Sequence, residues 1–195
     1  ALNYFQIKQT KRGKNVLVIE AIKRILKNFI LHETKLLEEG NSIIIKFLEY
    51  ESPLKQFATE GGQHVNLKGH IDRIDIFNGV YRIIDYKTGS FQSPEIKCKD
   101  LSELDKKPKL LQLLLYAWLF SQKNSNISVP VLSGIINLRA LSFDFHPCYI
   151  NKSSEINKET MHKFESYLSS LIGQMFNTEL TFNHLERTED CRYCD

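Results

Sequence analysis

The sequence predicts an α/β sandwich in which helices flank a central mixed β-sheet. Apolar residues recur at helical spacing in three long segments, and β-rich segments separate them, so the elements follow the order α-β-β-β-α-β-β-α. Near the middle of the chain, Asn78-Gly79 stands between two β-rich runs. This dipeptide supplies the positive φ angles that a two-residue hairpin turn requires.

The first half of the chain supplies the first helix and the first strand. A helix is predicted over residues 16–39, because its apolar stripe stops at Gly40-Asn41. A strand is predicted over residues 42–51, which Pro53 ends. Residues 59–62 are interpreted as a loop that leads into the hairpin, which spans residues 68–89.

The hairpin places two acids against each other. With the Asn-Gly dipeptide as its two loop residues, Asp72 lies opposite Asp85, and His70 lies opposite Lys87. Opposed side chains have Cβ atoms roughly 4.5–5.5 Å apart. Two carboxylates at that separation repel each other, and a bound divalent cation would reverse the sign of that energy. We therefore predict a metal site at this end of the hairpin.

The two faces of the hairpin differ in character. Residues two apart in a strand share a face, so Asp85 and Lys87 point the same way, together with Asp72 across the ladder. On the other face Asp75 lies opposite Arg82, which we interpret as an ordinary cross-strand ion pair. The alternative for the first face is a solvated surface cluster, because the D-x-K pattern is short and common.

Hard oxygen ligands with few protein donors suit Mg²⁺ or Mn²⁺, which keep several waters and take further ligands from a substrate phosphate. The main-chain carbonyl of Tyr86, between Asp85 and Lys87, is a candidate for another ligand. A lysine beside such a metal is suited to orient a water or to stabilise charge on a reacting phosphate.

The second half of the chain predicts one helix with a polar edge. After Gly89 the sequence has little periodicity, which predicts an exposed loop with at most a short helix. A helix over residues 110–122 brings Gln112 and Tyr116, four apart, to one face. The remaining predicted elements are strands over residues 129–141 and 142–150 and a helix that is capped by Ser153 or Ser154 and runs to residue 177.

Bulk properties set the class of protein. The chain of 195 residues suits a single domain, with residues 179–195 as a C-terminal tail. A net charge of +3 does not by itself identify a nucleic-acid binder, and the local lysine clusters fit either a solvated surface or a phosphate-facing role. Four cysteines do not suggest a disulfide framework, and the sequence shows no signal peptide or apolar run of membrane length. We expect a cytoplasmic protein with no membrane partner.

Three motifs follow one another in the order Gly69-His-Ile-Asp72, Ile84-Asp85-Tyr-Lys87-Thr-Gly89 and Gln112-Leu-Leu-Leu-Tyr116. Together they resemble the RecB- or AddB-type branch of the PD-(D/E)XK nuclease superfamily, over roughly residues 43–120. The resemblance implies a restriction-endonuclease-like sandwich with a central mixed β-sheet.

The resemblance also implies roles for individual residues. Asp72 and Asp85 bind the catalytic Mg²⁺ or Mn²⁺, and Lys87 assists the water. Gln112 and Tyr116 border the active site and contact the substrate. Glu49, on the preceding strand, is a further candidate acid near the metal.

Two departures from the family pattern concern a histidine and an iron–sulfur cluster. Many relatives carry a Gly-x-x-x-His segment ahead of the first acid, and His32 lacks the glycine, so it receives no role. Because the chain starts at Ala1 and stops one residue after Cys194, we expect a domain cut at both ends, with the family histidine upstream.

Some relatives hold a [4Fe–4S] cluster with one cysteine before the nuclease core and three after it. Cys191-Arg-Tyr-Cys194 resembles the start of the downstream group and offers two of the four ligands. Cys98 and Cys148 are expected to be ordinary thiols. A zinc site formed by all four cysteines is the alternative.

The function implied is a metal-dependent DNA nuclease, an exonuclease of a DNA-end-processing helicase–nuclease in recombination and repair. Its partners would be single-stranded DNA or DNA ends and a helicase domain or subunit of the full-length protein. The chain itself contains no G-x-x-x-x-G-K-[ST] phosphate loop. The alternatives are a catalytically silent DNA-binding or scaffolding module and a stand-alone CRISPR-associated RecB-like exonuclease.

Overall fold

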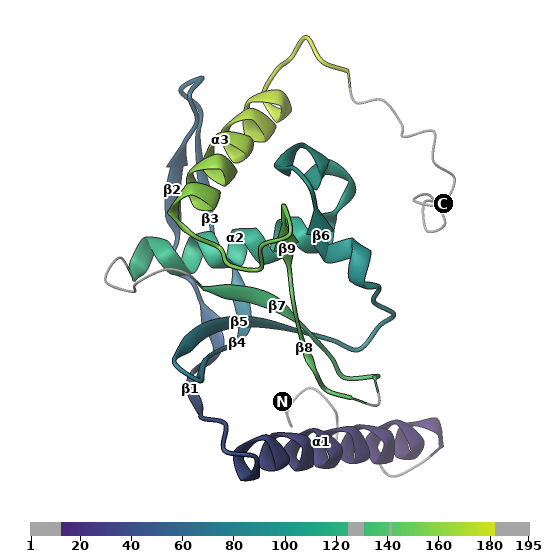
Figure 1. Ribbon diagram of the computed structural model, residues 1–195. Coiled ribbons are helices and arrows are strands. Elements are labelled where there is room, and N and C mark those ends of the chain that lie inside the picture. The colour runs from purple at the N-terminus through teal and green to yellow at the C-terminus, as the bar shows by residue number, and fades with distance from the viewer. Residues whose placement is uncertain (1–12, 125–130, 141, 182–195) are drawn as a thin grey trace.

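A five-stranded mixed sheet forms the centre of the molecule (Figure 1). The computed structural model describes residues 13–124, 131–140 and 142–181. Neighbouring strands of the sheet are antiparallel, except for one parallel pair, β5 and β7. In their order across the sheet, the strands are β1 (Ile43–Glu51), β4 (His70–Phe77), β5 (Val80–Lys87), β7 (Leu132–Asn137) and β8 (Phe145–Pro147). The predicted mixed α/β architecture is confirmed.

Helices cover both faces of this sheet. Figure 1 shows α1 (Lys14–Glu38) on one side, and α2 (Pro108–Lys123) and α3 (Lys158–Met175) on the other. The chain crosses the sheet through α2 between β5 and β7, because two parallel strands need a long connection. The core is accordingly divided into a large cluster around α2 and a smaller one beneath α1.

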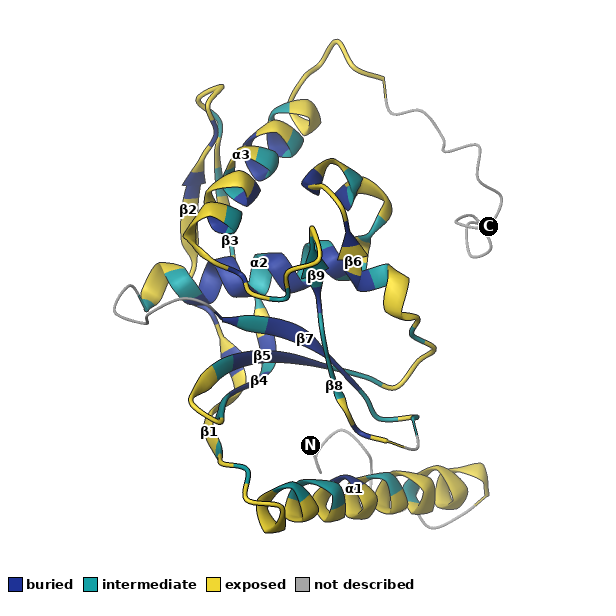
Figure 2. Cartoon of the chain, in the orientation of Figure 1, coloured by how far each residue is buried: buried dark blue, intermediate teal, exposed yellow. Residues whose placement is uncertain are grey.

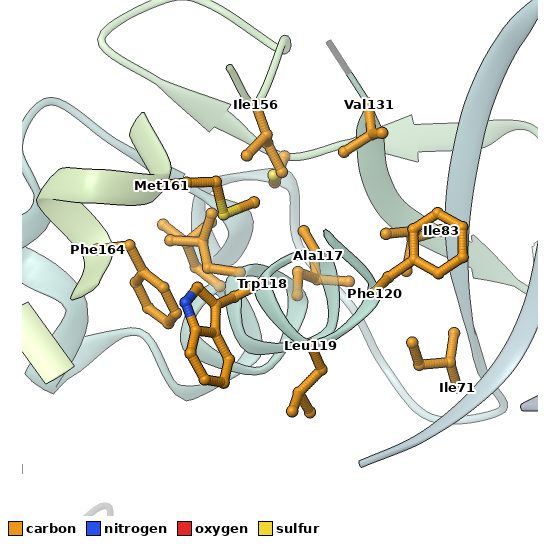
Figure 3. Packing of buried hydrophobic residues seen from close by; sticks show 14 of the residues in the cluster. Ile71, Ile83, Ala117, Trp118, Leu119, Phe120, Val131, Ile156, Met161 and Phe164 are labelled. Carbon is orange, nitrogen blue, oxygen red and sulfur yellow. The ribbon is translucent and has the colours of Figure 1, made fainter. Parts of the chain in front are cut away.

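The helix α2 is the most buried helix of the fold. Seven of its residues are buried, and Figure 3 shows its aromatic and aliphatic side chains packed between the sheet and α3. The Trp118 ring meets Phe57 edge-on at 5.6 Å, and its Nε1 donates a hydrogen bond to Glu165 Oε1 on α3 at 2.7 Å. Ser133 of β7 donates to the main-chain oxygen of Leu113 at 2.9 Å. These contacts hold α2 in a fixed position above the end of β5.

The hairpin of β4 and β5 has the predicted turn. Asn78 and Gly79 have φ angles of 49° and 85°, the left-handed conformation that a type I′ turn requires at both positions. Phe77 pairs with Val80, and the pairing continues in the predicted register as far as Arg73 and Ile84. Asn78 also accepts a hydrogen bond from the main-chain nitrogen of Ser42, which ties the turn to the start of β1.

The predicted loop over residues 59–62 is the turn of a second hairpin, whose two short strands were not predicted. β2 (Lys55–Ala58) and β3 (His64–Leu67) form a two-stranded antiparallel sheet beside α3 (Figure 1). Its turn is tied to α3, because the main-chain nitrogen of Glu60 donates to Ser169 Oγ at 2.8 Å. Strands of four residues are too short to give a clear alternation of apolar and polar residues, so the sequence pattern did not reveal them.

The stretch after Gly89 is more ordered than predicted. It contains the short helices η1 (Ser93–Ile96) and η2 (Leu101–Lys106), separated by β6 (Lys97–Cys98). β6 pairs in parallel with β9 (Tyr149–Ile150). Ile96, Leu101 and Leu104 are buried in the large core, so the prediction of an exposed loop was wrong.

The last strands and the last helix also differ from the prediction. Cys148 separates β8 from β9 in the segment expected to be one strand. The cap of α3 is Asn157, whose side chain accepts from the main-chain nitrogen of Thr160 at 2.9 Å, so the predicted cap at Ser153 or Ser154 was wrong. Ser153 instead bonds to the main chain of Ile150 and Glu155 in the preceding turn.

The second face of the hairpin holds a buried charge cluster beneath α1. Asp75 is fully buried, and Arg82 contacts both of its carboxylate oxygens at 2.8 Å. Arg73, also buried, lies 2.7 Å from Asp75 and 2.6 Å from Glu33 of α1. The predicted cross-strand pair of Asp75 with Arg82 is therefore confirmed, but it is a buried member of a larger charge cluster and not an ordinary surface pair, because a helix distant in sequence covers this face.

The outer surface of α1 is largely exposed (Figure 2). Of its apolar stripe, only Phe29 is buried, where its ring meets Tyr86 and Phe143 edge-on. Among the described residues, no helix is long and apolar enough to cross a membrane.

Replacement of two glycines by alanine should change the stability of the protein in opposite directions. A Cβ at Gly134 would collide with the main-chain oxygen of His146 and lie 2.8 Å from the Phe145 ring, whereas one at Gly173 meets nothing within 4 Å. We expect Gly134→Ala to lower the free energy of unfolding by about 3 kcal/mol, and Gly173→Ala to raise it by up to about 1 kcal/mol. Urea unfolding of both variants checks this, and equal responses would contradict the close approach of β8 to β7.

Candidate active site

The end of β5 carries the two central side chains of the site. Asp85 and Lys87 are two residues apart on this strand, so both point toward α2. Asp85 is only 4% exposed, and its Oδ2 lies 2.7 Å from Lys87 Nζ. Lys87 is half-buried, so its ammonium is more accessible to solvent than the acid that it contacts.

Two side chains of α2 continue this line of contacts. Lys87 Nζ donates to Gln112 Oε1 at 3.2 Å, and Gln112 Nε2 donates to the Tyr116 hydroxyl at 2.8 Å. The amide oxygen of Gln112 accepts from the lysine and its amide nitrogen donates to the tyrosine, so the orientation of the Gln112 amide is determined. Because the hydroxyl accepts from Gln112, its own proton is available to another acceptor. The structure thus brings together four of the predicted site residues.

Asp72 enters the site from β4, where the two strands of the hairpin separate. The pairing of β4 with β5 ends at Arg73 and Ile84, one position short of the expected Asp72–Asp85 pair. Beyond it, the main-chain nitrogen of Tyr86 donates to Asp72 Oδ2 at 2.7 Å. The Asp72 carboxylate thus replaces the main-chain carbonyl that would accept this hydrogen bond if the pairing continued. The bond holds Asp72 beside the D-x-K segment.

Electrostatic interactions connect Asp72 with the other site residues. Burial raises the pKa of Asp85, Lys87 opposes that shift, and the charge of Asp72 adds to it. Burial also raises the pKa of Tyr116, Gln112 opposes the shift, and both aspartates contribute to it. Asp85 Oδ2 is buried, with the Lys87 ammonium 2.7 Å away. Two close carboxylates, one of them buried, fit a divalent cation with oxygen ligands.

Glu49 and His70 lie at the outer edge of the same site. The pairs Leu48–Arg73 and Tyr50–Ile71 place Glu49 opposite Asp72. His70 Nε2 is 3.3 Å from Glu49 Oε2, and ligand atoms of Glu49, His70 and Asp72 lie within 4.8 Å of one another. Glu49 was already a candidate, but His70 was missed as a candidate ligand.

The predicted pairing of His70 with Lys87 is not observed. On its other edge β4 places His70 opposite Glu51 of β1, and on its other edge β5 places Lys87 opposite Asn137 of β7. The pairing of β4 with β5 stops before it reaches His70 or Lys87. The spacing of two residues between His70 and Asp72 was the available signal, because such residues share a face of a strand.

Gly69 leaves room for the tyrosine. A Cβ at this position would lie 2.9 Å from Leu119 Cδ1 and 3.2 Å from the Tyr116 ring. Packing therefore explains why the first residue of the Gly69-His-Ile-Asp72 motif is a glycine, since any side chain there would displace Tyr116.

The remaining candidate residues lie elsewhere. Cys98 and Cys148 are buried free thiols, and burial raises their pKa values to about 11 and about 12. His32 lies on α1, with its ring 6.0 Å from that of Phe143, on the other side of the sheet. Cys191 and Cys194 lie outside the described residues.

The mixed sheet flanked by helices, with an acidic site at the open end of a hairpin, defines a protein of the restriction-endonuclease-like fold. The sequence profile of the PD-(D/E)XK nuclease superfamily matches residues 6–195, and the chain belongs to that superfamily. Its nucleases use divalent metal ions, in keeping with the oxygen ligands assembled here.

A solved structure described as "Crystal structure of SSO0001" is similar at 15% identity with a TM-score of 0.38. The match covers 87% of this chain and 64% of that one, so the chain spans less than two thirds of that structure's length. No curated protein sequence matches.

Proposed function

We propose that the chain is the Mg²⁺- or Mn²⁺-dependent deoxyribonuclease domain of a RecB- or AddB-type protein that processes DNA ends. The observation that carries this proposal is the connected set Asp85–Lys87–Gln112–Tyr116 with Asp72 beside it. A solvated surface cluster would not bury Asp85, nor would it join a lysine to two side chains of another element.

The metal would be held by Asp72, Asp85 and the main-chain carbonyl of Tyr86. In a strand, the N–H and C=O of one residue point to the same neighbour, and the Tyr86 N–H points to Asp72. Glu49 is a candidate for a further ligand, because it lies opposite Asp72. When bound, the ion supplies Lewis-acid polarisation of the phosphate and a more acidic water.

The reaction is hydrolysis of a phosphodiester. The oxygen of a water forms a bond to phosphorus, the ester P–O bond breaks, and the leaving oxygen gains a proton. Lys87 orients the water and stabilises negative charge on the phosphoryl oxygens, since Asp85 and Gln112 hold its ammonium in place. Tyr116 donates its free proton to a phosphate oxygen and so positions the strand.

The setting of the domain follows from the same proposal. A helicase domain or subunit would feed a single strand to the site during recombination or repair. Cys191 and Cys194 would provide two ligands of a [4Fe–4S] cluster in the longer protein. The whole of residues 1–195 would act as one nuclease domain, with residues 179–195 as its tail.

The test combines DNA cleavage with thermal unfolding. We expect Mg²⁺ or Mn²⁺ to support cleavage of labelled single-stranded DNA and to raise the melting temperature, because the ion binds only the folded state. Asp72→Asn should raise the metal-free melting temperature by removing repulsion with Asp85, and should abolish the response to metal.

Two outcomes would contradict the proposal. DNA binding without cleavage, in a protein whose melting temperature ignores both ions, would indicate the scaffolding module instead. An unchanged metal response in Asp72→Asn would show that this carboxylate is not a ligand.

A further inference from the structure

A lysine-rich groove lies beside the segment that precedes α2. It is hollowed between the segment of η1, β6 and η2 and the turn after β9, with a volume of about 730 Å³. Lys97, Lys99, Lys107 and Lys152 line it, with Tyr149 and Pro94 among its other residues. Figure 1 shows β6 and β9 side by side near the N-terminal end of α2.

A smaller hollow extends from this groove to the first turn of α2. It has a volume of about 390 Å³, and it shares Pro94 and Lys107 with the larger groove. Lys109 also lines it, and this residue lies one helical turn before Gln112 on the same face of α2. The hollowed surface therefore begins within one helical turn of the residue that contacts Lys87.

The charge along this path is strongly positive. Six lysines line the two hollows against the glutamates Glu95 and Glu103, whereas the whole chain has a net charge of +3. Lys109 pairs with Glu95 at 2.6 Å, and Lys107 approaches Glu103 at 3.8 Å. Among the described residues, the ammonium groups of the other four lysines have no carboxylate within 4 Å: Lys97, Lys99, Lys106 and Lys152.

The groove also offers an aromatic surface. The ammonium of Lys97 lies over the Tyr149 ring, 5.0 Å from its centroid, which fixes a positive charge at the groove wall. A single strand presents phosphates to lysines and base faces to aromatic and apolar groups, whereas a duplex turns its bases inward. A positive groove with an aromatic wall is therefore better suited to a single strand than to a duplex.

We propose that single-stranded DNA runs from the candidate active site across the N-terminal end of α2 and into this groove. The inference rests on the proposed nuclease function, which it deepens by assigning the path of the substrate. Lys97 and Lys152, on opposite walls, contact phosphates two or more nucleotides away from the cleaved bond.

The test measures binding and cleavage of DNA strands of two lengths by a double variant. Lys97→Glu with Lys152→Glu should weaken binding of an oligothymidine of about 20 nucleotides by about 10-fold or more in the absence of divalent metal. The slope of log affinity against log salt should become shallower by about 0.7 for each phosphate that a lysine no longer neutralises. Cleavage of a strand of about 4 nucleotides should remain unchanged, because that strand is too short to need the groove.

The matched control is Lys27→Glu with Lys46→Glu. It changes net charge equally, but both lysines are exposed on α1 and β1, away from the groove. Binding of the long strand by the groove variant at the level of this control would overturn the inference. Equal displacement of the strand by polyglutamate of matched charge would also overturn it, since the groove would then bind any anion.

The proposed nuclease activity can fail independently of the proposed DNA path. If the wild-type chain cleaves neither strand, the proposed catalysis fails, and the metal-free binding data still decide the path. A second pair, Lys97→Gln with Lys152→Gln, should give a smaller loss of affinity in the same direction, so that misfolding of the charge-reversed protein cannot imitate the result.

Discussion

Lys87→Ala and Asp85→Asn should each lower the rate of Mg²⁺-dependent DNA cleavage by about 10²–10⁴-fold, the largest effect that we expect in this protein. Lys87 contacts both Asp85 and Gln112, so its removal separates the acid from the helix that positions the strand. Asp85→Asn retains the shape of the side chain but removes the charge that binds the cation. Single-turnover cleavage with saturating metal measures both effects.

Stability data separate this result from misfolding. Burial raises the pKa of Asp85, which means that the metal-free fold disfavours the carboxylate. Asp85→Asn should therefore melt at or above the metal-free wild-type temperature while it loses activity. Lys27→Ala, on an exposed part of α1, is the control and should cleave at the wild-type rate. Cleavage at the wild-type rate by either site variant would contradict the assigned roles.

Asp75→Asn should lower the free energy of unfolding by about 3–5 kcal/mol. The substitution conserves volume, so no cavity forms, but it leaves the buried guanidinium groups of Arg73 and Arg82 without their shared carboxylate. Glu33 still pairs with Arg73, whereas Arg82 loses both of its charged hydrogen bonds. Because this cluster joins β4, β5 and α1, the hairpin that carries Asp72 and Asp85 should loosen as well.

Urea unfolding provides the measurement, since the chain has a single tryptophan and that residue, Trp118, is buried in the core. Glu20→Gln is the matched control, because the Glu20–Lys23 pair on α1 is exposed and should contribute little. An Asp75→Asn protein that unfolds at the urea concentration of the wild type would show that the buried cluster does not stabilise the sheet.

Local chemistry made part of the site predictable from the sequence. The Asn78-Gly79 turn fixed the register of β4 and β5, because these residues adopt positive φ at little cost. The period of a strand placed Asp85 with Lys87, and the period of a helix placed Gln112 with Tyr116. Each of these features depends on only a few neighbouring residues, so it does not depend on how the rest of the chain packs.

Contacts between distant segments decided the rest. Asp72 bonds to Tyr86 only because the hairpin strands separate at that end, and Glu49 lies beside His70 only because β1 pairs with β4 in one register. The character of Asp75 depended on α1, whose Glu33 is 40 residues from Arg73 in the sequence. Likewise, the lysines of residues 97–109 became a groove wall only when β9 paired with β6. The sequence by itself determined which residues could do the chemistry. Tertiary packing decided which of them are buried together and which line the same surface, because burial and strand pairing depend on segments far apart in the chain.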